Sequence, residues 1–228
     1  MKKIIITLAV IISVCGNMAA QDANYPTSIG PFLTIKSGLN GTMAPDGRRN
    51  TIAFNGLPDF GGTLYIPVHA EKKLGIVLEL AYSTYAYQLK STRTDDKYTM
   101  KYSYLTFSPN FYVNSIMLGF NFGYPVTADF SGANIKSSKL NFMAELRLAG
   151  MIPIIVDETG RLNAYIYAGY MLTGVYKNIA TDDPMLLHLP INSVNTPKYT
   201  NEFNPRAISL AIGVNYLFNI QQAATEAE

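Results

Sequence analysis

The sequence contains few of the residues that build disulfide frameworks, metal centres or catalytic sites. Its 228 residues include one cysteine, two histidines and no tryptophan, and charged residues make up 15% of the chain. In typical soluble domains about a quarter of all residues are charged. After residue 20, no apolar run approaches the roughly 20 residues that a membrane-spanning helix needs. A mature chain that crosses a membrane would therefore have to do so as a closed β-barrel.

Residues 1–20 have the features of a secretory signal peptide that is removed from the mature protein. Two lysines precede an apolar segment, Ile4–Val14, and the small residues Ala19 and Ala20 follow it, in the order found in such signals. A retained anchor or a buried first helix is the alternative. Removal takes away Cys15, so the mature chain keeps no thiol for disulfides, metal binding or catalysis. Both lysines leave as well, so the 18 basic residues fall to 16 and equal the 16 acidic ones. This balance gives no electrostatic reason to expect nucleic acid as a partner.

The remaining chain alternates between large apolar and small or polar residues with a period of two, as in a β-strand with two unlike faces. In the stretch SIMLGFNFGY, mostly small or polar residues separate five apolar ones: Ile116, Leu118, Phe120, Phe122 and Tyr124. Similar alternation predicts eight strands, near residues 30–38, 61–69, 74–87, 98–113, 115–124, 140–150, 162–176 and 207–218. Pro67 and Pro109 weaken two of these assignments, because proline removes a donor from the strand ladder.

The connections between the predicted strands alternate between short and long. The short ones are residues 70–73, Asn114 and residues 156–161; the long ones are residues 41–60, 89–97, 125–138 and 177–205, with no convincing helix. Short turns at one end and long loops at the other are the arrangement of bacterial outer-membrane barrels. We therefore predict an all-β fold: an eight-stranded antiparallel up-and-down transmembrane β-barrel. It would comprise residues 21–220, followed by a polar tail at 221–228.

Period two alone does not say which face of each strand points inward. The polar face consists mainly of glycine, alanine, serine and asparagine, which suit the narrow interior of an eight-stranded barrel. Four charged residues fall on this face: Lys36, Glu79, Glu145 and Arg147. We predict that they form a charge network in the lumen, because a cation facing lipid at mid-depth costs roughly 2–4 kcal/mol. We interpret the network as interior packing; a gate or a weak proton or ion path is the alternative.

Many tyrosines lie near the ends of the predicted strands: Tyr82, Tyr85, Tyr87, Tyr98, Tyr102, Tyr124, Tyr176 and Tyr216. An amphipathic ring suits the boundary between lipid and water. We therefore expect these tyrosines to mark the two edges of the membrane.

The signal ending at Ala20-Gln21, the opening strand GPFLTIKSGLNG and the closing strand AISLAIGVNYLFNI resemble small outer-membrane β-barrels of the OmpA/OmpX-like kind. More narrowly, the chain is similar to the "outer membrane protein beta-barrel domain" proteins common in Bacteroidetes. The alternating aromatics Tyr216 and Phe218 resemble the terminal signal read by the barrel assembly machinery, although ten residues follow Phe218. The resemblance implies a location in the cell outer membrane, contact with its lipid and insertion by that machinery. It carries no catalytic motif.

Residues suited to catalysis are sparse. His69 ends a predicted strand, and His188 lies in the longest predicted loop with Ser193 nearby. No glycine-rich phosphate loop or zinc-ligand spacing occurs, so we expect no enzymatic activity, no cofactor and no metal. The main interpretation is a monomeric barrel with a filled polar lumen and a structural, adhesive or ligand-contacting role of its external loops. The alternatives are a narrow pore or transporter, a lipid-modifying enzyme using His188, and a secreted soluble barrel whose large residues face inward.

Overall fold

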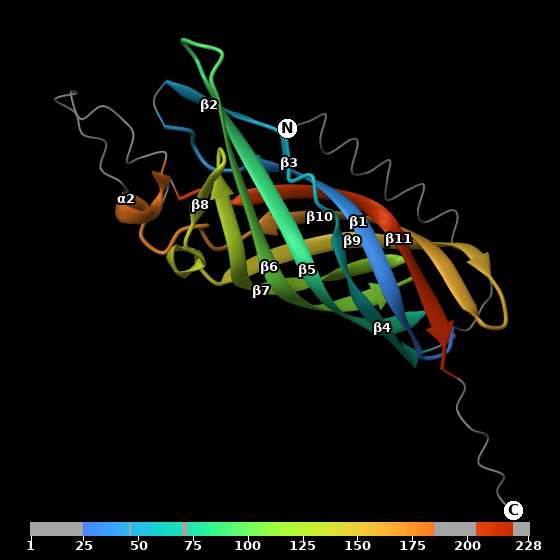
Figure 1. Ribbon diagram of the computed structural model, residues 1–228. Helices are drawn as coiled ribbons and strands as arrows, with labels where there is room; N and C mark the ends of the chain where they lie inside the picture. Colours follow the sequence, from blue (N-terminus) through green and yellow to red (C-terminus); the bar gives the residue numbers. More distant parts are fainter. Residues whose placement is uncertain (1–24, 46, 70–72, 185–203, 221–228) are drawn as a thin grey trace, which may run out of the picture.

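The computed structural model describes residues 25–45, 47–69, 73–184 and 204–220. They form a barrel of long, tilted antiparallel strands with extended segments at one end (Figure 1). The predicted signal peptide, the tail at 221–228, His188 and Ser193 lie outside the described residues.

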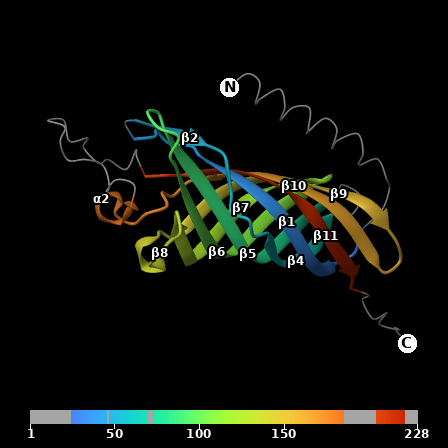
Figure 2. The same ribbon diagram turned by 45° about the horizontal axis from the view of Figure 1, so that its top comes forward.

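Eight of the described strands form the wall of the barrel. They are β1 (Ser28–Asn40), β4 (Asp59–His69), β5 (Leu74–Ser91), β6 (Lys97–Val113), β7 (Ile116–Phe130), β9 (Met143–Val156), β10 (Gly160–Met171) and β11 (Ala207–Asn219). They pair in the order β11-β10-β9-β7-β6-β5-β4-β1, and pairing of β1 with β11 closes the ring. The turned view in Figure 2 shows the same strands wrapping around one axis. The prediction of an all-β, eight-stranded antiparallel up-and-down barrel is confirmed.

The two ends of the barrel differ, and we call them the turn end and the loop end. At the turn end, Asn114 and Ser115 join β6 to β7 with φ angles of 47° and 75°, as a tight hairpin requires. The short segment 157–159 joins β9 to β10 at the same end. The start of β1 and the end of β11 also lie there, since Ser28 pairs with Asn219.

The loop end carries the shorter elements. These are β2 (Arg48–Thr51) beside β5, β3 (Ala53–Phe54) beside β1, β8 (Ala133–Ile135) beside β7, the 3₁₀ turn η1 (Ser137–Lys139) and the one-turn helix α2 (Ile179–Asp182). In the described part of the connection predicted over 177–205, α2 is a single helical turn of four residues. No helix within the described ranges is long and apolar enough to cross a membrane.

The prediction of a long loop over residues 89–97 was also wrong. Strand β5 continues to Ser91 and β6 begins at Lys97, so only five residues join them. Pairing with β2 supports this extension, because Arg48–Thr51 lie opposite Gln88–Ser91. The polar composition of the segment concealed this extension, and the tip of β5 and β6 projects beyond the other wall strands (Figure 1).

The large apolar residues point outward. Leu80, Phe111 and Leu210 are 63%, 72% and 58% exposed. In the stretch that first showed the alternation, Leu118, Phe120, Phe122 and Tyr124 are exposed, whereas the residues between them are buried. A barrel with the large residues inside is therefore excluded. The interior is lined by the opposite face of each strand, which carries the small, polar and charged residues together with buried tyrosines and methionines.

Candidate functional site

The barrel interior holds two clusters of buried aromatic and aliphatic side chains with a charged layer between them. The cluster near the loop end comprises Tyr85, Tyr87, Leu89, Met100, Tyr102, Tyr104, Ala128, Leu140, Met143, Met171, Val175, Tyr176 and Ala207. The cluster near the turn end comprises Tyr65, Val77, Tyr112, Met117, Ala149, Met151, Tyr165, Tyr167, Ala211 and Leu217. Every wall strand except β1 thus contributes side chains to these clusters.

The expected position of four tyrosines at the edges of the membrane was wrong. Tyr85, Tyr87, Tyr102 and Tyr176 are buried in the loop-end cluster. In β5, Tyr85 and Tyr87 continue the inward phase of Glu79, which lies an even number of residues earlier. The alternation of inward and outward residues along the strand therefore decides where these tyrosines point, and the amphipathic character of the ring does not. Tyr124 does point outward and is 70% exposed.

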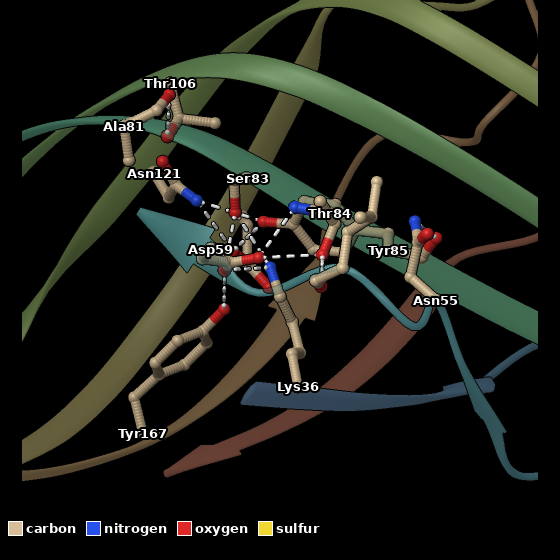
Figure 3. Close-up of polar contacts among 12 residues, drawn as sticks. Lys36, Asn55, Asp59, Ala81, Ser83, Thr84, Tyr85, Thr106, Asn121 and Tyr167 are labelled. Atoms are coloured by element: carbon tan, nitrogen blue, oxygen red, sulfur yellow. Dashed lines mark hydrogen bonds and ion pairs between the residues drawn. The ribbon is translucent and has the colours of Figure 1, made fainter. Parts of the chain in front are cut away.

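Lys36 on β1 forms a buried ion pair with Asp59 at the start of β4. The Lys36 Nζ atom lies 2.8 Å from Asp59 Oδ2 and donates to Ser83 Oγ over 2.8 Å. It also lies 3.4 Å from the centre of the Tyr85 ring, a cation–π contact. Asp59 Oδ1 accepts hydrogen bonds from the backbone N–H and the hydroxyl of Thr84, at 2.7 and 2.9 Å. Figure 3 shows Asp59 surrounded by these donors.

Arg147 on β9 pairs with Glu79 on β5 and also donates to the hydroxyl of Tyr165 on β10. The Tyr165 hydroxyl donates to Glu79 Oε1 over 3.1 Å, so the three side chains form a closed triangle. The guanidinium carbon lies 4.3 Å from the centre of the Tyr167 ring. Three separate strands are thereby tied together across the interior.

Glu145 on β9 has different partners. Its Oε2 atom accepts hydrogen bonds from the Tyr85 hydroxyl at 2.8 Å and from Asn121 Nδ2 at 3.0 Å. Asn121 in turn accepts a hydrogen bond from Ser108 Oγ at 2.8 Å. The neighbouring Gly169 provides the space for the carboxylate, because a Cβ atom there would lie 2.1 Å from Glu145 Oε1.

The structure places all four sequence-predicted residues, Lys36, Glu79, Glu145 and Arg147, in the charged layer, each at most 5% exposed. The ion pairs are Lys36 with Asp59 and Arg147 with Glu79. Sequence reasoning missed Asp59, which precedes the predicted start of its strand. Its position two residues before Gly61, in the inward phase of Thr63 and Tyr65, is the signal that identifies it.

A second missed residue, Arg161 on β10, lies near the turn end and is 2% exposed. Its guanidinium carbon is 4.0 Å from the centre of the Tyr25 ring and 4.4 Å from that of Tyr65. It directly precedes the stretch LNAYIYAGY, and its position one residue before the outward Leu162 is a signal that its side chain points inward.

One small cavity lies within the charged layer. A cavity of about 10 Å³ is lined by Asp59, Glu79, Asn121 and Arg147 together with Phe32, Ala81, Ser83, Thr106, Ser108 and Tyr167. This is about the minimum volume for one water molecule. Within the described residues, no group of three His, Cys, Asp or Glu side chains is arranged to hold a metal ion. The arrangement suits interior cross-linking of the wall better than ligand binding.

Fold and interior together define a closed antiparallel β-barrel with an apolar exterior and a charged core. No protein-family model and no curated protein sequence matches the chain. Among solved structures, the chain is similar to the outer membrane protein OprG from Pseudomonas aeruginosa, with 13% sequence identity and a TM-score of 0.41. The similarity covers 87% of this chain and 99% of that one. At this level it carries no functional argument, and the fold rests on the strand pairing described above.

Proposed function

We propose that this protein is an integral outer-membrane β-barrel that acts through its loop end and does not conduct. The observation that carries the proposal is the apolar belt, defined as the outward residues that alternate along each wall strand. On β11 the belt runs from Ile208 to Phe218. Ten residue steps of 3.3 Å at a tilt of about 40° correspond to a height of about 25 Å, which matches the apolar band of outer-membrane barrels.

The distribution of charge supports the same placement. Within the described wall strands, outward-facing charged residues occur only near the loop end: Lys90, Lys97, Lys101 and Asp129. The other charged residues of these strands, Lys36, Asp59, Glu79, Glu145, Arg147 and Arg161, are all buried inside. A water-soluble barrel has no reason to exclude charge from its outer face, whereas a lipid-facing surface does.

The packing of side chains in the interior supports a filled lumen and a role without conduction. Two side-chain clusters and two buried ion pairs cross the axis, and the interior cavity among them has room for about one water. We assign the protein no reaction and no cofactor. Its role would be envelope structure, adhesion or ligand contact through the loop end, as a monomer in outer-membrane lipid that the barrel assembly machinery inserts.

Two measurements test this proposal. The protein should fractionate with outer membranes, resist extraction by carbonate and migrate faster on gels before heating than after. Release by carbonate would overturn the membrane placement. In planar lipid bilayers the purified barrel should give no discrete current steps. Regular steps that persist after repeated purification would favour the narrow pore instead.

A further inference from the structure

Three cations lie side by side across three strands near the loop end. Arg49 on β2 pairs in register with Lys90 on β5, and Lys90 pairs in register with Lys97 on β6. Residues directly opposite each other in an antiparallel sheet project from the same face, and like charges in such positions are destabilising. We call these three residues the cationic row.

Few negative charges offset this repulsion. Among the described residues, the one ion pair of the row joins Lys90 Nζ to Asp95 Oδ1 at 2.5 Å, and the Asp95 side chain is 96% exposed. The hydrogen bond from Lys90, and then the charges of Lys90, Lys97 and Arg49, lower the pKa of Asp95. One solvent-exposed carboxylate therefore experiences all three cations, and the row retains a net positive charge.

The row lies on the outer face of the wall, above the apolar belt. Lys97 shares the outward phase of Leu105 and Phe107 in β6, and Figure 1 shows β2 and the β5–β6 tip projecting beyond the barrel at the loop end. Lys101, in the same phase, is four residues from Leu105, which places it about 10 Å above the belt, and Lys97 is eight residues from Leu105, which places the row about 20 Å above the belt. In the proposed placement Lys101 lies at the level of lipid headgroups, and the row lies above that level.

A groove lies beneath the row on the same outer face. It has a volume of about 590 Å³ and is lined by Ile52, Ala53, Phe54, Gln88, Thr99, Lys101, Asp129, Ser131 and Gly132. Among its lining residues, Gln88 Nε2 donates to Thr99 Oγ1 over 2.8 Å, and Phe54 is 65% exposed. Hydroxyl, amide and carboxylate groups next to an exposed ring suit a saccharide, and the volume is that of a small-molecule site.

We propose that the cationic row and the groove together bind the headgroup of a phosphorylated glycolipid in the surrounding membrane. The row would contact phosphate, and the groove would contact the attached sugar. The apolar belt below the groove would hold the acyl chains, which is why we assign the site to a lipid and not to a free anion. This inference rests on the proposed membrane placement.

The test compares two variants of the full chain reconstituted in neutral phosphatidylcholine vesicles. Arg49→Gln/Lys97→Gln removes two cations of the row, whereas Lys136→Gln/Lys177→Gln removes two exposed cations elsewhere at the loop end. The probes are bisphosphorylated lipid A and the same lipid without phosphates. We expect the row variant to lose about 30-fold in affinity for the bisphosphorylated lipid, from the usual contribution of cations near an anionic surface. The control variant and the dephosphorylated lipid should show no comparable loss.

Further measurements separate the outcomes. In neutral lipid the melting temperature of the row variant should equal or exceed that of the wild type, because the substitution relieves repulsion between the cations. A loss of binding could then not be explained by misfolding. Equal losses in both variants, or displacement of the lipid by inorganic phosphate at similar affinity, would overturn the inference. The change in gel migration on heating reports separately whether each variant has inserted into the membrane. A barrel that inserts without discriminating phosphate would overturn this inference alone, whereas one that fails to insert would overturn the proposed function as well.

Discussion

Arg147 and Glu79 form an ion pair across the barrel interior, although β6 and β7 separate their two strands around the sheet. Their side chains are 5% and 1% exposed. Since neither group reaches bulk water, each depends on the other for compensation of its charge. The pair therefore connects opposite parts of the wall.

Removing one partner of this pair should be costly. We expect Arg147→Met to lower the free energy of unfolding by about 3–5 kcal/mol, because Glu79 remains as a buried, unpaired charge. The double variant Glu79→Met/Arg147→Met should lose less than this single variant. Urea unfolding in vesicles measures both. Lys139→Met, which removes the more exposed partner of Asp182, serves as a control with an expected effect under about 1 kcal/mol. A similarly small effect of Arg147→Met would contradict the argument.

Gly169 should not tolerate a side chain. In Gly169→Ala the new Cβ atom would meet Glu145 Oε1 at 2.1 Å, which would displace the carboxylate from Tyr85 and Asn121. We expect a loss of about 1–3 kcal/mol in unfolding free energy, as for other overpacked interiors. Gly62→Ala is the matched control, because nothing lies within 4 Å of a Cβ atom at that position. Equal effects of the two substitutions would show that the space beside Glu145 is not required.

The apolar belt can be tested with one charge. Ile212 lies midway along the outward face of β11 and is 58% exposed. In a membrane, Ile212→Arg should cost roughly 2–4 kcal/mol; in water, an exposed substitution of this kind usually changes stability by less than about 0.5 kcal/mol. Asn134→Arg on β8, beyond the belt, is the control. Unfolding titrations that give the same stability for both variants would argue against a lipid-facing belt.

The turn between β9 and β10 should give a defined dependence on pH. The Thr159 hydroxyl, at 2.6 Å, and the backbone N–H groups of Gly160 and Thr159, each at 2.9 Å, donate to Asp157 Oδ1. These hydrogen bonds lower the pKa of Asp157 in the folded state. A carboxyl group whose pKa is lower in the folded state than in the unfolded state stabilises the fold. This stabilisation is fully present above the unfolded pKa of about 3.9. That stability is lost as the pH falls through the folded value.

The isosteric variant Asp157→Asn isolates this contribution. The urea midpoint of the wild type should exceed that of Asp157→Asn by a constant amount between about pH 7 and pH 5, and the difference should shrink below about pH 4. Glu158→Gln, which removes a negative charge from the adjacent residue, is the control variant. A difference that grows on acidification would have the wrong sign for this mechanism.

The wall of the barrel was predictable because alternation is a local property of the sequence. Each wall strand buries one face and exposes the other, so residues such as Phe120 and Asn121 report their orientation directly. The charged layer was predictable for the same reason: Glu145 and Arg147 share the phase of buried Met143.

Other features depend on which residues meet across the ring, and alternation does not encode this. Lys36 pairs with Asp59 because β1 and β4 are adjacent in the sheet and Asp59 extends β4 by two residues beyond its predicted start. The four buried tyrosines were misplaced because their position was inferred from residue type, whereas the alternation along the strand determines which way a side chain points. The extension of β5 and β6 beyond the belt lacked the apolar face by which the other strands were found.

Direct pairing of β1 with β11, along eleven register positions from Ser28 to Asn40, has a consequence for how the molecule is made. The two strands that complete the ring lie at opposite ends of the described chain, so neither finds its last partner until the other has been synthesised. Until then the growing sheet has two free edges, each able to recruit a strand from another molecule. Biogenesis must shield both edges at once, and a chain that stops short of β11 would remain an open, adhesive sheet.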